Sequence, residues 1–403
     1  MRDVVVVGAG AAGLMAAIQA GRRGASVVAL DSAKHLGAKI LVAGGGRCNV
    51  THHAVDETAF SGSTAPAIRR VLSRFPVDAT VSFFGELGVK LKREETGKLF
   101  PTTDRARTVL DALLRAAGEA GVELSHPFRV EAVRRTPDGF TVSGSAGNVK
   151  ARRVILATGG MSLPRSGSDG HGYAIARSFG HTTTARIFPA LVPLSLARGS
   201  FVRELPGVAC EAAVTVRSGS GRRLIEMRGS LLCTHTGLSG PVVLDVSRHL
   251  AAAGWDDGEA HLTVAWVDRV DPDQTLSAWL RGKLPVRLAD ALLAEAKVDP
   301  SARWERLSRD ERRRVETTLT AWRAPVTGDL GFAKAEVTAG GVPLSEVRLA
   351  TMESRVAPGL FLCGEILDVD GRIGGFNFQW AWASGYVCGS SSLSGGTTPD
   401  ASR

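Results

Sequence analysis

The sequence predicts an α/β fold in which both ends of the chain build one nucleotide-binding domain and an inserted module interrupts it. Three observations support this prediction. An apolar, β-branched run, a glycine-rich turn and a small-residue helix occupy residues 4–21. A second strand-like run and glycine-rich turn occur at residues 359–377. Between them, at about residues 190–337, short strand patterns are followed by helical ones.

The first glycine-rich turn has the spacing of a dinucleotide-binding fingerprint. Residues 8–13 read G-A-G-A-A-G between the first strand and helix, and an acid, Asp31, follows the second strand. Gly8 permits a tight turn, Gly10 lets the backbone approach a pyrophosphate, and Gly13 allows close packing of helix and strand. Asp31 is placed to accept hydrogen bonds from ribose hydroxyls. The sequence therefore predicts a Rossmann-like domain.

The far end of the chain favours FAD over NAD, which share this phosphate cradle. Glu365 follows a strand-like run, and Gly374-Gly375-Phe376-Asn377 starts a helix. A carboxylate at this point can bind a polyol hydroxyl, and a helix N-terminus can face the flavin atoms that become negative on reduction. NAD has no ribityl chain that needs a second clamp. The alternative is an ordinary strand-to-helix turn.

These motifs resemble those of the BaiN/YhiN-like flavoproteins, also called aminoacetone oxidase family FAD-binding enzymes. The resemblance covers most of the chain, and its most specific strings are GGGRCNVT and GE-x-LDVDG-x-x-GG-x-N-x-Q. It implies an FAD fold without a separate NAD domain, with an inserted β-barrel-like and helical module, and flavin-dependent redox chemistry such as reduction of conjugated enones in bile-acid-type steroids. The matching segments are residues 39–40, 43–51, 157–160, 234–241, 338–342, 351–354 and 364–379.

Two positions depart from the family pattern. The chain has Asp169-Gly170-His171-Gly172-Tyr173 where T-G-D-G-Y is usual, and Asp31 where many relatives carry Glu. The first departure affects either a flavin-proximal loop or simply a turn, and the second is conservative.

The motifs and the resemblance together give the predicted site. Arg47 and His235 are the candidate catalytic residues. The predicted cofactor-binding residues are Gly8, Gly10, Ala12, Gly13, Asp31, Lys39, Gly44, Gly45, Arg47, Cys48, Asn49, Val130, Ala157, Thr158, Gly159, Gly160, Gly364, Glu365, Asp370, Gly374, Gly375, Phe376 and Asn377.

Each candidate catalytic residue also has a structural interpretation. Arg47 either stabilises a reduced flavin or an anionic substrate, or pairs with a carboxylate. His235 either delivers a proton to a substrate or is a hydrogen-bonded structural histidine, and His171 has similar standing. Cys48 has no resolving cysteine nearby, so packing is favoured over redox chemistry. Trp380 and Trp382, on the last helix, are expected in the core.

The predicted domain boundaries follow the changes in pattern. Residues 1–189 and 338–390 form the FAD-binding domain, residues 190–270 an inserted β-rich domain, residues 271–337 an inserted helical segment, and residues 391–403 a disordered tail. In the helical segment, Asp273 is a plausible cap and residues 308–311 match a capping box.

Composition narrows the class of protein. There are 49 Lys and Arg against 40 Asp and Glu, giving a net charge of +9, but the signs alternate, so a nucleic-acid partner is not expected. No metal-ligand or nucleophile-elbow spacing is present. Five cysteines without paired spacing or a secretory leader favour the cytoplasm. The glycines in residues 4–21 argue against a membrane span, although this stretch carries no charge.

The predicted function is an FAD-dependent oxidoreductase acting on a small molecule. It takes hydride from a transiently bound NAD(P)H and passes it through flavin N5 to a conjugated, enone-type substrate. Only one dinucleotide fingerprint is present, so NAD(P)H is expected to visit the substrate face. The alternatives are an amine oxidase that uses oxygen, and an FAD-dependent RNA-modifying or flavin-binding protein.

Overall fold

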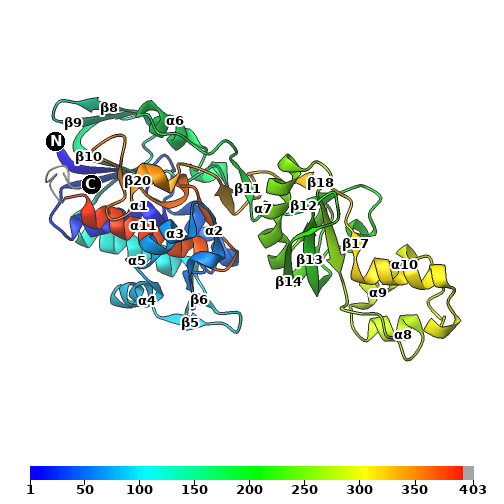
Figure 1. Cartoon of the computed structure of the whole chain (residues 1–403). Coiled ribbons are helices and arrows are strands. Elements are labelled where there is room, and N and C mark those ends of the chain that lie inside the picture. Colours follow the sequence, from blue (N-terminus) through cyan, green and yellow to red (C-terminus); the bar gives the residue numbers. More distant parts are fainter. Residues whose placement is uncertain (394–403) are drawn as a thin grey trace. The chain divides into compact units, whose positions relative to one another are not determined.

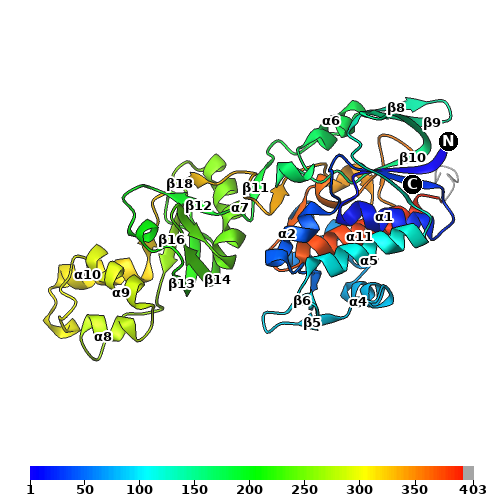
Figure 2. The ribbon, with the colours of Figure 1, turned by 180° about the vertical axis from the view of Figure 1, so that it is seen from behind.

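The computed structural model describes residues 1–393, which divide into two compact units. Residues 1–188 and 337–393 form the first unit, and residues 189–336 form the second. The strands β11 (Phe188–Ala190) and β19 (Val337–Ala339) lie where the chain leaves and re-enters the first unit. Figures 1 and 2 show the elements of each unit from opposite sides.

A largely parallel sheet forms the centre of the first unit. Its strand order is β20-β21-β22-β10-β1-β2-β7, and β22, β10, β1, β2 and β7 are parallel neighbours. The β-branched run at the start of the chain forms the middle of this sheet, where Val4, Val5 and Val6 have no exposed surface. The strands are β1 (Arg2–Val7), β2 (Val27–Leu30), β7 (Glu123–Ser125), β10 (Gly147–Leu156), β20 (Val347–Arg348), β21 (Glu353–Ser354) and β22 (Leu360–Leu362).

Three helices, α1 (Ala11–Gly21), α5 (Ala106–Glu119) and α11 (Phe376–Ser391), pack together in this unit (Figures 1 and 2). A Cβ built on Gly385 of α11 would lie 2.5 Å from the Ala12 carbonyl oxygen of α1, and one built on Gly389 would lie 2.1 Å from that of Ala16. The contacts advance along both helices together, so α1 and α11 run parallel, and only glycine on α11 permits this approach.

Three consecutive strands of the first unit form an antiparallel meander. The strands β8 (Val130–Thr136) and β9 (Gly139–Gly144) form an antiparallel pair, and β9 continues antiparallel onto β10. The helix α6 (His171–Ser178) follows.

The remaining strands and helices of the first unit are short. The strands β3 (Thr51–His52), β5 (Leu91–Arg93) and β6 (Lys98–Pro101) form a small sheet, and β4 (Phe60–Gly62) pairs with β23 (Val369–Gly371). The helices are α2 (Ala38–Gly46), α3 (Ala65–Leu72) and α4 (Val77–Glu86).

The second unit combines a seven-stranded sheet with helices. The strand order is β17-β16-β13-β14-β15-β12-β18. The strands are β12 (Leu194–Leu196), β13 (Ala209–Arg217), β14 (Arg223–Cys233), β15 (Gly237–Ser239), β16 (His261–Ala265), β17 (Trp322–Arg323) and β18 (Val326–Asp329); the helices are α7 (Pro241–Asp256), α8 (Leu276–Arg281), α9 (Val286–Glu295) and α10 (Arg309–Thr320). Its core is separate from that of the first unit.

Three details of the sequence prediction are corrected. The segment 271–337 is not purely helical, because β17 and β18 return from it to the sheet. The cap of α8 is Thr275, whose side chain accepts from the Ala278 amide, and not Asp273. The predicted disordered tail, residues 391–403, is wrong at its start, because Ser391 still belongs to α11; residues 394–403 lie outside the described part.

Other expectations hold. The capping box of α10 is present, with Ser308 and Glu311 each bonding the other's backbone amide. Trp380 and Trp382 are buried, as expected for the core. The uncharged stretch at residues 4–21 folds as β1 and α1. Over residues 1–393, no helix combines the length and apolar character needed to cross a bilayer.

Candidate functional site

The turn between β1 and α1 has the shape that the fingerprint predicts. Gly8 has φ +99°, and a Cβ there would lie 2.4 Å from the Ala157 carbonyl oxygen. A Cβ on Gly13 would lie 1.8 Å from the Gly8 carbonyl oxygen. Gly10 differs, since a Cβ there would meet no atom within 4 Å, and no side chain caps the helix that it starts. The backbone at Gly10 therefore borders open space at a helix end that favours anions.

Asp31 organises this turn from the end of β2. Its Oδ2 accepts a hydrogen bond from the Ala9 amide at 2.7 Å, and its Oδ1 accepts from the Ala33 amide at 2.8 Å. The carboxylate thereby fixes the strand end beside the glycine turn. The departure from Glu to Asp is compatible with this role.

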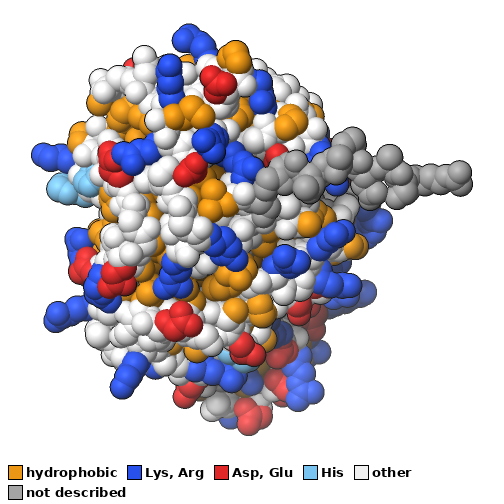
Figure 3. Space-filling model, turned by 90° about the vertical axis from the view of Figure 1, so that its left-hand side faces the viewer, with side chains coloured by type: hydrophobic (Ala, Val, Ile, Leu, Met, Phe, Trp, Pro, Cys, Tyr) orange, Lys and Arg blue, Asp and Glu red, His pale blue; other side chains and the backbone are white. Residues whose placement is uncertain are grey.

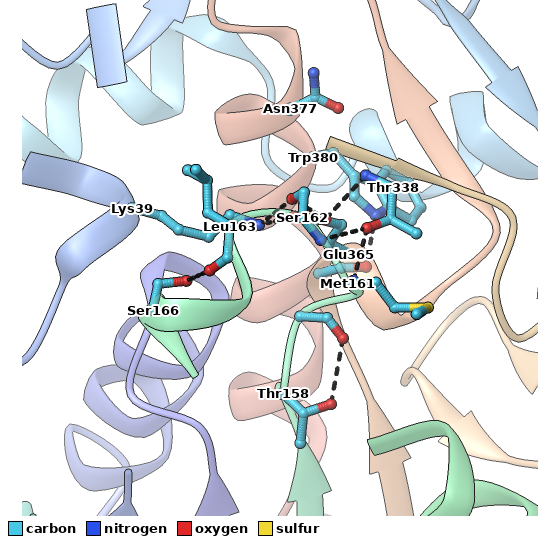
Figure 4. A network of polar contacts seen from close by, with 12 residues as sticks. Lys39, Thr158, Met161, Ser162, Leu163, Ser166, Thr338, Glu365, Asn377 and Trp380 are labelled. Carbon is cyan, nitrogen blue, oxygen red and sulfur yellow. Dashed lines mark hydrogen bonds and ion pairs between the residues drawn. The ribbon is translucent and has the colours of Figure 1, made fainter. Parts of the chain in front are cut away.

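A polar network around Glu365 joins four separate segments of the first unit (Figure 4). Glu365, in the short helical turn Gly364–Ile366, accepts from Lys39 Nζ at 2.6 Å, from Ser162 Oγ at 2.9 Å and from the Thr338 amide at 3.0 Å. Lys39 Nζ also donates to Ser162 Oγ at 2.7 Å, and Thr338 Oγ1 accepts from the amides of Met161 and Ser162.

These hydrogen bonds fix the position of the Glu365 carboxylate. The side chains of Lys39 and Glu365 are 26% and 21% exposed, so both charges remain close to solvent. A Cβ on Gly160 would lie 2.5 Å from Thr338 Oγ1 and 3.1 Å from Glu365 Oε1, which explains glycine at that position. Ser162 and Thr338 were not among the predicted site residues; Thr338 lies in a matching segment of the family, which was the available signal.

The glycine segment before Arg47 has a left-handed backbone. Gly44, Gly45 and Gly46 have φ of 57°, 69° and 87°, and a Cβ on Gly45 would meet nothing within 4 Å. The backbone of Ala43, Gly44 and Gly45 is not helical, so the regular helix of α2 ends at Val42.

Arg47 is engaged by protein groups. Its Nη1 lies 2.6 Å from Glu94 Oε1 and 3.7 Å from Asp104 Oδ1, and its guanidinium lies 4.0 Å from the centroid of the Phe100 ring. Of the two interpretations of Arg47, this geometry supports pairing with a carboxylate. Cys48 is fully buried, and burial raises the pKa of its thiol to about 12, which agrees with packing.

The N-terminus of α11 forms a second uncapped helix end. Gly375 has φ +96° and precedes the helix, no side chain caps it, and no acid lies in the first turn. Asn377 fixes the preceding turn: its Oδ1 accepts from the Gly371 amide at 2.8 Å, and its Nδ2 donates to the Gly371 carbonyl at 2.9 Å. Further along the helix, Trp380 Nε1 donates to the Gly364 carbonyl and Trp382 Nε1 to that of Val50.

The N-termini of α1 and α11 lie at different positions along the direction that these parallel helices share. The helix α11 starts nine residues before Gly385 and α1 starts one residue before Ala12, and these two positions are in contact. At 1.5 Å per residue, the α11 end therefore extends about 12 Å beyond the α1 end. An elongated ligand with an anionic middle and a ring at one end matches this arrangement.

Buried polar atoms without partners support the same fit. Among residues 1–393, six buried side-chain atoms lack hydrogen bonds, and three of them, Asn49 Oδ1, Ser168 Oγ and the Tyr173 hydroxyl, lie near Gly44, Gly159 and Glu365, respectively. Each such atom costs about 1–3 kcal/mol when it has no partner. Burial, and after it the negative charges of Glu365 and Asp368, raise the pKa of Tyr173, so its hydroxyl stays a donor. A polar ligand offering both donors and acceptors fits these residues, as FAD does.

The other predicted residues have varied positions. Val130 is buried at the start of β8, and Ala157 follows β10, with Thr158, Gly159 and Gly160 in the turn that leads to Ser162. Asp370 is buried on β23.

The candidate histidines make backbone contacts. His235 is an exposed residue of the second unit, and its carbonyl accepts from Arg203 Nε. His171 Nε2 donates to the Glu131 carbonyl, and Asp169 pairs with Arg129 at 2.6 Å, so residues 169–173, which depart from the family pattern, form the bend before α6 and the first turn of that helix. A catalytic role of His235 stays a prediction.

Known proteins resemble this chain over nearly its whole length. The 3-dehydro-bile acid delta(4,6)-reductase of Clostridium scindens is 36% identical over 414 aligned residues, covering 96% of this chain and 98% of the relative. The ribosomal RNA dihydrouridine synthase of Escherichia coli is 33% identical, with 96% of each chain covered.

A solved structure supports the fold. The 3-ketosteroid delta1-dehydrogenase of Sterolibacterium denitrificans matches with a TM-score of 0.54 and 15% identity, covering 97% of this chain and 99% of that one. The predicted α/β fold and the predicted oxidoreductase class are confirmed. The sequence profile described as "HI0933-like protein Rossmann domain" matches residues 2–391, and the chain therefore belongs to the HI0933-like family, as the resemblance predicted.

Proposed function

We propose that this protein is an FAD-dependent reductase of carbon–carbon double bonds conjugated to a carbonyl group. The observation that carries the proposal is the pair of uncapped helix ends at Gly10 and Gly375, with the Glu365 network in the same unit. This arrangement offers a place for a diphosphate, for a polyol and for a ring that gains negative charge.

The relatives' names share one type of chemistry. In a 3-dehydro steroid, double bonds at positions 4 and 6 are conjugated with the 3-carbonyl group. Dihydrouridine differs from uridine by reduction of the C5–C6 double bond, which is conjugated with the C4 carbonyl. Both reactions add a hydride and a proton across an electron-poor double bond. We therefore assign this reaction type to the present chain.

The residues of the chain have distinct tasks in this proposal. When bound, FAD would supply the hydride-transfer chemistry. The backbone at Gly10 binds the diphosphate, and Glu365, oriented by Lys39, Ser162 and Thr338, binds polyol hydroxyls. The N-terminus of α11 stabilises negative charge on the ring.

The reductant and the substrate are also proposed. We propose NAD(P)H as the reductant. The chain has a single dinucleotide fingerprint, which the diphosphate of FAD would use, so NAD(P)H would bind only transiently, on the substrate face. A small enone is the first substrate candidate, supported by the relative at 36% identity. A uridine in RNA is the second, supported by two relatives named ribosomal RNA dihydrouridine synthase, at 33% and 30% identity. These two relatives weigh against the prediction that nucleic acid is not a partner.

Anaerobic kinetics test the proposal directly. Protein loaded with FAD is mixed with NADH or NADPH, and flavin absorbance is followed. A 3-oxo-4-ene steroid or a uridine-containing RNA is then added to the reduced protein. Reoxidation of the flavin, with mass-spectrometric detection of a product that has gained two hydrogens, is the expected result. Failure to retain FAD would refute the proposal, and a flavin that neither pyridine nucleotide reduces would refute the reductant.

A further inference from the structure

A group of cationic and aromatic side chains surrounds the start of α11. His52 and Lys98 are cross-strand neighbours on β3 and β6, and the His52 ring stacks on that of Phe376 with centroids 5.0 Å apart. The Arg372 guanidinium lies 5.3 Å from the centroid of the Phe376 ring. The Cε of Lys98 lies 3.7 Å from where a Cβ on Gly374 would be. Arg372 thus lies over the Phe376 ring, and Lys98 lies beside Gly374 just before α11.

These two cations differ from Arg47 and Lys92, which lie in the same region. Arg47 is paired with Glu94, and Lys92 is paired with Asp104. Within residues 1–393, by contrast, Lys98 and Arg372 form no ion pair. Arg372 is also exposed, so its charge is available to an anion from solution.

Exposed planar side chains lie in the same region as the unpaired cations Lys98 and Arg372. His53 is exposed and lies beside His52, with ring centroids 4.6 Å apart. Asn377 Nδ2 donates a hydrogen bond to the Arg372 carbonyl at 3.5 Å and so helps to hold the turn that carries Arg372. An imidazole and a guanidinium plane are groups on which unpaired RNA bases stack. We name Lys98, Arg372 and His53 the rim cluster.

The surplus charge of the protein lies in the unit that carries this cluster. Residues 1–188 and 337–393 contain 28 Lys and Arg against 20 Asp and Glu, whereas residues 189–336 contain 20 against 19. A positive field of this kind raises the local concentration of polyanions. A small steroid with one carboxylate does not need several free cations at this end of α11.

We propose that the rim cluster docks the phosphate backbone of a single-stranded RNA segment and places a uridine of that segment at the neighbouring reductase site. Lys98 and Arg372 contact phosphates, and the planes of His53 and Arg372 support bases. This inference rests on the proposed function and selects its RNA branch. The three residues come from β6, from the turn before α11 and from the residue after β3.

Binding of a fluorescein-labelled, uridine-rich RNA oligonucleotide over a range of salt concentrations tests the docking surface. The variant combines Lys98→Gln with Arg372→Gln, which removes two charges but keeps polar side chains of similar shape. We expect at least about tenfold weaker binding and a slope of log affinity against log salt that is lower by about 1.4, since each phosphate contact on a single strand contributes about 0.7.

The matched control combines Arg23→Gln with Lys150→Gln. Both residues are exposed and lie at the end of the sheet where β1 begins, opposite the helix ends of the site. Figure 3 views this side and shows Lys and Arg side chains spread over it. The control loses the same charge, so we expect RNA binding close to that of the unmodified protein.

The outcomes separate docking from the enzymatic proposal. Loss of RNA affinity in the Lys98 and Arg372 variant alone, with normal FAD content and normal flavin reduction, supports the inference. Equal losses in both variants would mean non-specific attraction and would overturn it. Undetectable RNA binding by the unmodified protein would also overturn it, while steroid reduction in that case would leave the proposed function intact. A protein that never retains FAD fails the proposed function first.

Discussion

The contact between α1 and α11 gives a sharp prediction for Gly385→Ala. A Cβ at this position would lie 2.5 Å from the Ala12 carbonyl oxygen and 3.1 Å from Met15 Cβ. The nearest atom belongs to the backbone of a buried helix, so a side-chain rotation cannot relieve the overlap. The two helices must move apart, and their separation also sets the position of the two helix ends at the site.

The cost follows from the size of the overlap. Inserting one methyl group into a well-packed contact typically destabilises a protein by about 1–3 kcal/mol. For a domain of this size, each kcal/mol lowers the melting temperature by about 2–4 °C, so we expect a decrease of about 2–12 °C. FAD should also bind more weakly, because displacement of α11 moves the Gly375 end away from its place relative to Gly10.

Differential scanning calorimetry with and without FAD, together with fluorescence titration of FAD, measures both effects. Gly118→Ala in α5 is the control, because a Cβ there would meet no atom within 4 Å. This exposed helical position should gain about 0.5–1 kcal/mol from the substitution. The two alanine variants are thus expected to shift the melting temperature in opposite directions.

An unchanged or increased melting temperature for Gly385→Ala would refute the reasoning. That result would mean that α1 and α11 are not in backbone contact. The argument that their N-termini form one elongated site, about 12 Å from end to end, would then lose its basis.

Three further predictions concern individual side chains. Glu365→Gln should weaken FAD binding by about tenfold or more, since hydrogen bonds to a charged group contribute about 1.5–3 kcal/mol, and equilibrium titration would show it; unchanged affinity would remove Glu365 from the site. Burial alone would raise the pKa of Glu346, but hydrogen bonds from Thr182 and His181 outweigh it and hold the pKa of this carboxyl below its usual range. The carboxylate therefore stabilises the fold at neutral pH, and Glu346→Gln should melt earlier there, with the difference fading as the pH falls through the lowered pKa of Glu346; a pH-independent difference would contradict this. Cys48 should resist alkylation by iodoacetamide in the folded protein at about pH 8, because burial raises its pKa to about 12, and peptide mass spectrometry after brief treatment would reveal any modification.

Several local elements could be predicted from the sequence alone. The G-A-G-A-A-G turn, the meander of β8, β9 and β10 and the capping box at Ser308 follow from residues close together in the chain. Their patterns reflect backbone geometry and periodic burial, which a short window records. The predicted cap of α8, Asp273, was wrong. Thr275 and Asp273 are both acceptable caps, and which of them caps the helix depends on where the helix packs.

Only the tertiary structure decided which distant groups meet. Lys39 and Glu365 are 326 residues apart, yet their charged atoms lie 2.6 Å from each other. It likewise pairs Arg47 with Glu94, whereas no carboxylate within residues 1–393 pairs with Lys98 or Arg372. Nothing in local composition distinguishes a paired arginine from a free one, because pairing depends on the path of the whole chain. For the same reason, the parallel contact of α1 with α11 emerged from the fold and not from the periodicity of either helix.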